Sequence, residues 1–205
     1  IRSNSCSKKL VKRKIHMLNF NKIIEIIISL QIIIISTFVP VFLEIPNTNK
    51  FFGTFDIPIT YQVPAIIVIT LIFKRNIVIN SFSVYLIIGL FFIPVFHEGG
   101  SLGYLLTPNF GYLLGIYPLI IIIDKFKKIK KKNIYFDFIK YGILAISSMH
   151  FTGIIYSLVQ SIYYEQSEIL FYNLAKYSLS KYGYHLLMLT PIILFIKMIK
   201  NRYQR

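Results

Sequence analysis

The sequence predicts an all-α integral membrane protein with six transmembrane helices and both termini in the cytoplasm. Of its 205 residues, 55% are hydrophobic and 15% are charged, whereas soluble domains carry about 25% charged residues. Mean hydropathy is +0.63, and the apolar residues form runs about as long as a bilayer-crossing helix. The basic residues, which give a net charge of +15, cluster between these runs, as the topology of a membrane protein requires.

The charge and cysteine patterns narrow the possible functions. The basic run 125–132 could bind RNA by composition alone, but membrane topology explains it without a nucleic-acid partner. Cys6 is the only cysteine, and no Cys/His spacing fits a metal site. No G-x-x-x-x-G-K-[ST] segment occurs. We therefore expect no metal, cofactor or catalytic residues, and any energy for transport must come from a partner.

The first half of the chain begins with a basic tail, residues 1–22, followed by a first span at 23–42. Its twenty residues suffice to cross a hydrocarbon core of about 30 Å. A mixed loop is expected at 43–55. The second span, 58–73, is shorter and starts at Pro58, a residue that suits the first turn of a helix. The third span is predicted at 77–96.

The fourth span, expected at 104–123, is unusual because proline and glycine interrupt its outer end. Non-helical backbone at membrane depth is tolerated where it is buried in protein or lines a polar cavity. A fifth span is predicted at 134–156 and a sixth at 184–199, which completes a transmembrane domain over 23–199. Residues 157–182 are expected to be polar and interfacial, with tyrosines such as Tyr177 in an aromatic belt. The basic tail 200–205 ends the chain.

Lysine and arginine set the orientation. With the N-terminus inside, the basic clusters face the cytoplasm and only Lys50, Lys176 and Lys181 lie outside. Spans two, four and six then start on the outer side, where helix N-termini favour an anion. This predicts an outward pocket lined by 56–62, 97–112 and 182–185. The alternative is that these glycines and prolines only make short loops between packed helices.

The polar side chains available at this pocket are mainly amides and phenols. A carboxamide such as that of Gln62 or Asn109 presents a donor and an acceptor side by side, which complements a cyclic urea. Aromatic faces, including those of Tyr112 and Tyr184, supply area for a small heterocycle. The spans carry no internal acidic pair, which argues against a stand-alone ion-coupled carrier.

Three segments carry a family resemblance: D-I-P-I-T-Y-Q-V-P at 56–64, Y-L-I-I-G-L-F-F-I-P-V-F at 85–96, and G-G-S-L-G-Y-L-L-T-P-N-F-G-Y-L-L-G at 99–115. They resemble the BioY family, the biotin-binding S components of energy-coupling-factor (ECF) vitamin importers. The resemblance implies an S-component-like six-helix bundle that captures biotin outside and delivers it inward. It also implies an ECF transmembrane coupling protein and two ATPase subunits as partners, besides membrane lipid.

The resemblance and the pocket together give the predicted binding residues. These are Thr60, Gln62, Gly99, Gly100, Asn109, Gly111, Tyr112, Lys181 and Tyr184. The sequence departs from the family at 182–187, where only the glycine of a P-G-D-L-x-K segment remains, and in the first span, which lacks an A-x-x-x-A motif. Lys181, His185 or the helix N-termini are the candidates to replace the missing cation.

Three alternatives stay open at this point. The chain could be an S component for another vitamin or small heterocycle. It could be a membrane-embedded enzyme using His97, Glu98 and His150, which would then lie about 3 Å from one another. A structural subunit would have a packed outer half without a cavity. The plasma membrane is the expected location, with a plastid membrane as the alternative if residues 1–16 are a targeting leader.

Overall fold

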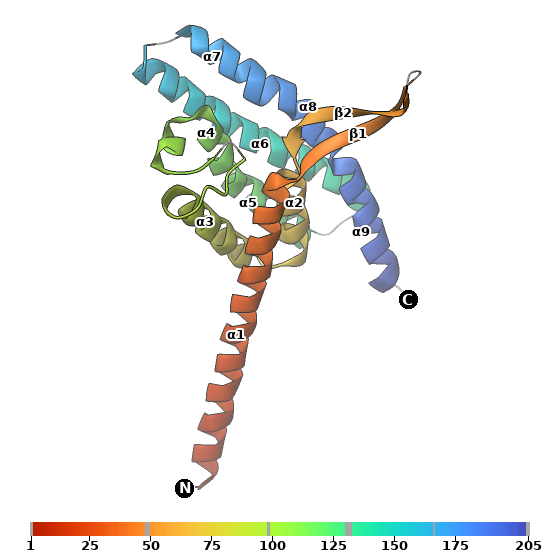
Figure 1. Cartoon of the computed structure of the whole chain (residues 1–205). Coiled ribbons are helices and arrows are strands. Elements are labelled where there is room, and N and C mark those ends of the chain that lie inside the picture. Colours follow the sequence, from red (N-terminus) through yellow and green to blue (C-terminus); the bar gives the residue numbers. More distant parts are fainter. Residues whose placement is uncertain (1, 48–49, 98, 130–132, 166, 204–205) are drawn as a thin grey trace.

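The computed structural model describes residues 2–47, 50–97, 99–129, 133–165 and 167–203. Side chains are described for residues 20–41, 57, 59–97, 99–129, 133–165 and 170–197. Within these ranges the chain is mostly helical, as the sequence predicts, and one β-hairpin interrupts the helices (Figure 1).

The first half of the chain forms a long helix, the hairpin and two short helices. These are α1 (Arg2–Phe38), β1 (Pro40–Asn47), β2 (Lys50–Thr60), α2 (Gln62–Ile72) and α3 (Arg75–Phe91). The second half contains the 3-10 turn η1 (Leu102–Leu106), α4 (Pro108–Leu114), α5 (Ile116–Lys128), α6 (Ile134–Tyr163), α7 (Ser167–Asn173), the π-helical turn η2 (Leu174–Leu179), α8 (Ser180–Leu187) and α9 (Leu189–Tyr203).

Four apolar helical segments among the described residues are long enough to cross a membrane. They are Phe20–Phe38, Pro108–Lys128, Ile134–Tyr163 and Leu170–Lys197. Gln62–Ile72 and Arg75–Phe91 are apolar but shorter. Large apolar side chains point outward from several of these helices, for example Ile35, Phe91 and Phe151, each more than 60% exposed. Such a surface suits lipid contact and makes the chain an integral membrane protein.

The hairpin is the main departure from the sequence prediction, which expected a loop at 43–55 and a helix from Pro58. In the structure Pro40 pairs with Thr60 and Val41 with Ile57, so the chain stays extended until the helix begins at Gln62. Ile57 and Ile59 alternate onto one buried side, as in a strand. Pro58 is tolerated there because a two-stranded sheet leaves edge positions without a ladder partner.

The polar stretch after the fifth span also differs from expectation. Helix α6 continues to Tyr163, and α7, η2 and α8 follow, so most of 157–182 is helical. A π-helical turn widens the helix locally and shifts the side chains that follow it. This shift turns Tyr177 inward; its side chain is only 8% exposed, and the aromatic-belt prediction for it is wrong.

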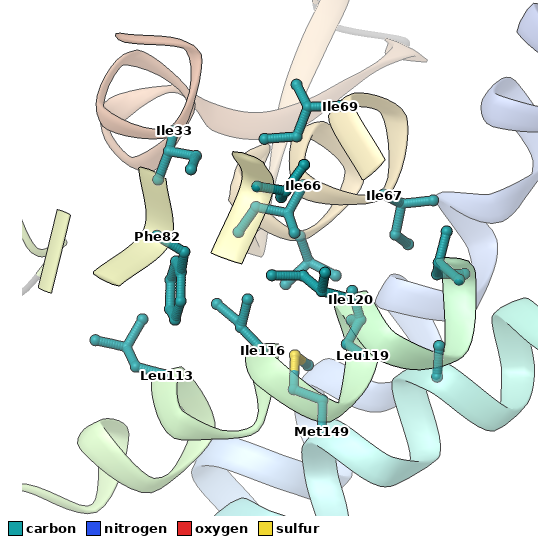
Figure 2. Close-up of a cluster of buried hydrophobic side chains, with 14 of the residues drawn as sticks. Ile33, Ile66, Ile67, Ile69, Phe82, Leu113, Ile116, Leu119, Ile120 and Met149 are labelled. Atoms are coloured by element: carbon teal, nitrogen blue, oxygen red, sulfur yellow. The ribbon is translucent and has the colours of Figure 1, made fainter. Parts of the chain in front are cut away.

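The core lies where α2, α5 and α6 meet, with α1 and α3 on one side (Figure 2). Ile66 and Ile67 of α2 face Leu119 and Ile120 of α5, and all four are at most 1% exposed. A fully buried aliphatic side chain of this kind contributes about 1.5–3 kcal/mol. This packing fixes the start of α2 relative to α4 and α5, which is where the candidate site lies.

Candidate functional site

A cavity of about 100 Å³ opens at the end of the bundle near the hairpin. It can hold several waters, since one water needs roughly 10–15 Å³. Its wall comes from the end of β2, the starts of α2 and α4, the middle of α6, and the segment from η2 to α8. The lining residues are Ile59, Thr60, Gln62, Val63, Tyr85, Phe96, His97, Tyr104, Asn109, Tyr112, Leu113, Ile116, Met149, Tyr177, Lys181 and His185.

An aromatic group forms one wall of the cavity. The ring centroids of Tyr85 and Phe96 lie 5.3 Å apart, edge to face, and those of Phe96 and Tyr104 lie 4.6 Å apart. All three side chains are at most 7% exposed. Such rings offer a rigid apolar surface to a small heterocycle.

Gln62 is a firmly held polar residue of the site. Its side chain is 8% exposed, and Nε2 donates to the Tyr85 hydroxyl at 3.0 Å. The Tyr85 hydroxyl in turn lies 3.3 Å from Thr37 Oγ1 and donates to the Val95 carbonyl at 3.4 Å. The carboxamide is therefore oriented by a network anchored in α1 and α3. Gln62 also begins α2, so the free amides of the first turn lie beside it.

Asn109 and Tyr112 reach the cavity from α4. That helix starts with Pro108 at its first position, directly after Thr107, and proline suits this position because its ring presets φ and the missing N–H is not needed. Asn109, Tyr112, Leu113 and Ile116 follow at helical spacing, so one face lines the cavity. The Tyr112 hydroxyl is buried and makes no hydrogen bond within the described part of the chain.

The glycines of the predicted site also have a packing role. A Cβ on Gly111 would overlap Tyr156 of α6, and one on Gly115 would overlap the Met149 backbone. Facing them, Gly153 of α6 receives the ring of Tyr112. Gly111 and Gly115 thus form a G-x-x-x-G pair that brings α4 and α5 close to α6. Gly111 is not among the cavity-lining residues.

Gly99 and Gly100 shape the loop that covers Phe96. Gly99 has φ +114°, a conformation open to glycine but strained for other residues. A Cβ on Gly100 would collide with the backbone at Pro94 and Gly89. The Ser101 N–H donates to the Gly89 carbonyl at 3.0 Å and ties the loop to the end of α3. Both glycines position the loop and neither lines the cavity.

Lys181 brings a cation to the cavity from α8. Its ammonium lies 5.2 Å from the ring centroid of Tyr177, which also lines the cavity. A positive charge is therefore present although residues 182–187 lack the family's lysine. Tyr184 instead packs against Val41, Ile57 and Ile59 of the hairpin, outside the cavity.

A buried histidine pair borders the cavity: His185 lines it together with Lys181, and His150 does not line it. His150 Nδ1 is hydrogen-bonded to Ser178 Oγ and Nε2 to His185 Nδ1, both at 3.1 Å. Both ring nitrogens of His150 are thus occupied, which leaves none for His97 and argues against the enzyme alternative. Glu98 lies outside the described residues. Among the residues that are described, no group of three metal-ligating side chains occurs.

The cavity brings together Thr60, Gln62, Asn109, Tyr112 and Lys181 of the predicted site. The prediction omitted the apolar and aromatic lining, such as Tyr85, Phe96 and Met149, although Tyr85 and Phe96 bound one of the segments that carry the family resemblance. Nothing in their spacing alone separates a lining aromatic from a core aromatic. His185 was considered only as a substitute cation.

Comparison with known proteins matches these features to one family. The model of the BioY family matches residues 12–182. A crystal structure of the S-component for biotin from an ECF-type ABC transporter has a similar fold, with a TM-score of 0.57 at 19% sequence identity. The match covers 88% of this chain and 93% of the other. No curated protein sequence matches the chain.

Proposed function

The chain belongs to the BioY family, and on that premise we propose that it is the substrate-binding membrane subunit of a biotin importer. It takes biotin from the outer side and delivers it inward together with an ECF energising module. The chain is a transporter subunit and not an enzyme in this proposal.

One observation carries the proposal: a single cavity joins two carboxamides, an aromatic wall and an ammonium group. Biotin has matching parts, namely a ureido ring, a thioether ring and a carboxylate on an aliphatic chain. Gln62 and Asn109 supply donors and acceptors for the ureido ring, with Thr60 beside them. Phe96 and Tyr104 cover the ring system.

Lys181 pairs with the carboxylate in this arrangement. Its side chain lines the cavity from α8, together with the amides of α2 and α4. A charge-assisted hydrogen bond to a carboxylate is worth about 1.5–3 kcal/mol. Tyr177 holds the ammonium in place through its ring face.

The partners and the membrane placement extend the same proposal. An ECF transmembrane coupling protein and two ATPases drive the transport step. In this proposal the chain has six spans within 23–199 and basic cytoplasmic tails at 1–22 and 200–205, and the cavity opens to the outer side of the plasma membrane.

Biotin binding to the purified protein in detergent tests the proposal, measured by calorimetry and by thermal shift against thiamin, riboflavin and folate. Of these four vitamins, only biotin should raise the melting temperature. Gln62→Ala and Asn109→Ala should each weaken binding by roughly 5- to 30-fold, the loss of about 1–2 kcal/mol of hydrogen bonding.

Gln31→Ala is the matched control, because Gln31 is an exposed amide on α1 outside the cavity. It should leave biotin affinity unchanged. Binding of another vitamin in place of biotin would keep the S-component class and refute the substrate. Binding of none of the four would refute the proposal.

A further inference from the structure

A second cavity, of about 830 Å³, lies at the other end of α2 from the cavity proposed for biotin. It forms where the beginning of the apolar part of α1, the turn between α2 and α3, and the end of α5 meet. Its lining residues are Lys22, Ile26, Lys74, Arg75, Asn76, Ile77, Asn80, Asp124, Lys127 and Lys128. We name this cavity the basic cleft. Its volume is in the range of small-molecule sites, about 300–1,000 Å³.

The charge of the basic cleft is strongly one-sided. Five cationic side chains face a single carboxylate, Asp124. That carboxylate is already paired, since Lys128 Nζ lies 2.6 Å from Asp124 Oδ2. The remaining cations therefore set the potential in the cleft.

Lys127 has a structural role at the end of α2, which Lys22, Lys74 and Arg75 do not share. Its ammonium donates to the carbonyls of Thr70 at 2.8 Å and Phe73 at 2.5 Å, at the C-terminal end of α2. These carbonyls are the ones a helix leaves unpaired, and a lysine there is favourable. For Lys22, Lys74 and Arg75, no ion pair occurs among the described residues.

The chemistry of Lys22, Lys74 and Arg75 suits a phosphate group. Arg75 offers a planar fork of donors that matches phosphate oxygens, and Lys22 and Lys74 add compact charges. Arg75 and Asn76 are in the first turn of α3, whose partial positive charge adds to the same field.

Apolar surface continues outward from the basic cleft. Ile23 and Ile27 of α1, adjacent to Lys22 and Ile26, are 53% and 48% exposed, and Ile72 at the end of α2 is 54% exposed. A molecule with a phosphate head and apolar tails would meet charge in the cleft and apolar side chains beside it.

We propose that the basic cleft is a binding site for a phosphate-bearing anion, such as the headgroup of an anionic phospholipid. Lys22, Lys74 and Arg75 hold the phosphate, while Lys127 and Lys128 maintain the walls through their contacts with α2 and Asp124. The site is separate from biotin binding and does not depend on the substrate assignment.

Lipid retention by the purified protein tests this proposal. Affinities for short-chain phosphatidylglycerol and phosphatidylcholine are measured by native mass spectrometry, and inorganic phosphate is titrated separately by thermal shift. The anionic lipid should bind more tightly. Lys74→Gln/Arg75→Gln should lower its affinity about 25-fold, from about fivefold per removed charge.

Lys140→Gln/Lys197→Gln is the matched control, because it removes two exposed cations that do not line the cleft. It should change the affinity less than twofold. If inorganic phosphate alone stabilises the wild type and competes with the lipid, free phosphate is the ligand, and the phosphate site stands.

Two results would overturn the proposal. One is equal affinity for both lipids without any effect of phosphate. The other is an equal loss in the cleft and control variants, which would mean attraction by overall charge only. Should the double variant fail to fold, Lys74→Gln alone decides, because Lys74 is exposed at the helix boundary and should fold normally.

Discussion

The carboxamide of Gln62 is held by the protein before any ligand arrives. Its Nε2 is fixed by Tyr85, whose hydroxyl is shared with Thr37 and the Val95 carbonyl. A side chain that is already ordered loses little entropy on binding, which would otherwise cost about 0.5–1.5 kcal/mol. The affinity of the site thus depends on Tyr85 as well as on the residues that touch the ligand.

We predict that Tyr85→Phe weakens biotin binding and destabilises the protein by about 1–3 kcal/mol, because it leaves the buried Gln62 amide without its acceptor. Thermal denaturation and calorimetry measure the two effects. Tyr117→Phe is the control: its hydroxyl is also hydrogen-bonded, to Ser83 at 2.9 Å, but it does not line the cavity. The control should lose stability and keep its affinity; equal loss of affinity in both variants would contradict the role of Tyr85.

Tyr112 should behave in the opposite way. Its hydroxyl is buried near the Ser157 and Ser178 hydroxyls but makes no hydrogen bond of normal geometry in the described part of the chain, so Tyr112→Phe removes only weak polar contacts. We expect stability to stay constant or rise by about 1 kcal/mol. Biotin affinity should change less than twofold if the ring of Tyr112, and not its hydroxyl, contacts the ligand. A large loss of affinity in calorimetry would show that the hydroxyl binds the ligand.

At the scale of elements, the contact of α4 and α5 with α6 determines where Asn109 lies. This contact depends on Gly111, Gly115 and Gly153, each of which would collide with its neighbour if it carried a Cβ. Close helix approach through small residues is a general means of packing in membranes. The glycine-rich segment therefore positions Asn109 through its packing against α6.

We predict that Gly115→Ala destabilises the protein by about 1–3 kcal/mol, because the added Cβ meets the Met149 backbone, which cannot rotate away. Gly183→Ala is the control, since a Cβ there meets nothing within 4 Å. Helix propensity should make that variant more stable by about 0.5–1 kcal/mol. The two melting temperatures should move in opposite directions, and a joint decrease would refute the packing role.

The elements also show what the sequence can predict. Apolar runs of helical length identify α2, α3, α5 and α6, because a helix that is buried against lipid and protein requires mainly apolar residues. The hairpin could not be predicted, because Ile57 and Ile59 alternate over too few residues to distinguish a strand from a loop. The sequence cannot separate glycines that contact a ligand from glycines that contact a helix, because both contacts need a residue without a side chain.

The whole molecule has polar sites at both ends of a short helix. The cavity proposed for biotin lies at the start of α2, and the basic cleft lies beyond its end. The orientation proposed from charge puts the basic cleft on the cytoplasmic side and the other cavity on the outer side.

This orientation predicts which positions react with a membrane-impermeant maleimide. In a Cys6→Ser background, Leu106→Cys near the cavity should be labelled in intact cells, because Leu106 is 66% exposed. Lys125→Cys, exposed at the end of α5, should be labelled only after the membrane is permeabilised. The reverse pattern would show that the cavity opens to the cytoplasm.

The length of α2 has a consequence for the transport step. Its 11 residues span about 16 Å, roughly half of a hydrocarbon core of about 30 Å. If α2 lies along the membrane normal, with Lys74 and Arg75 at the inner headgroups as proposed, Gln62 would lie near the bilayer midplane. In that orientation, a solute bound in the cavity would be held well below the outer surface of the membrane, and the transport step would have to open the inner side of the site.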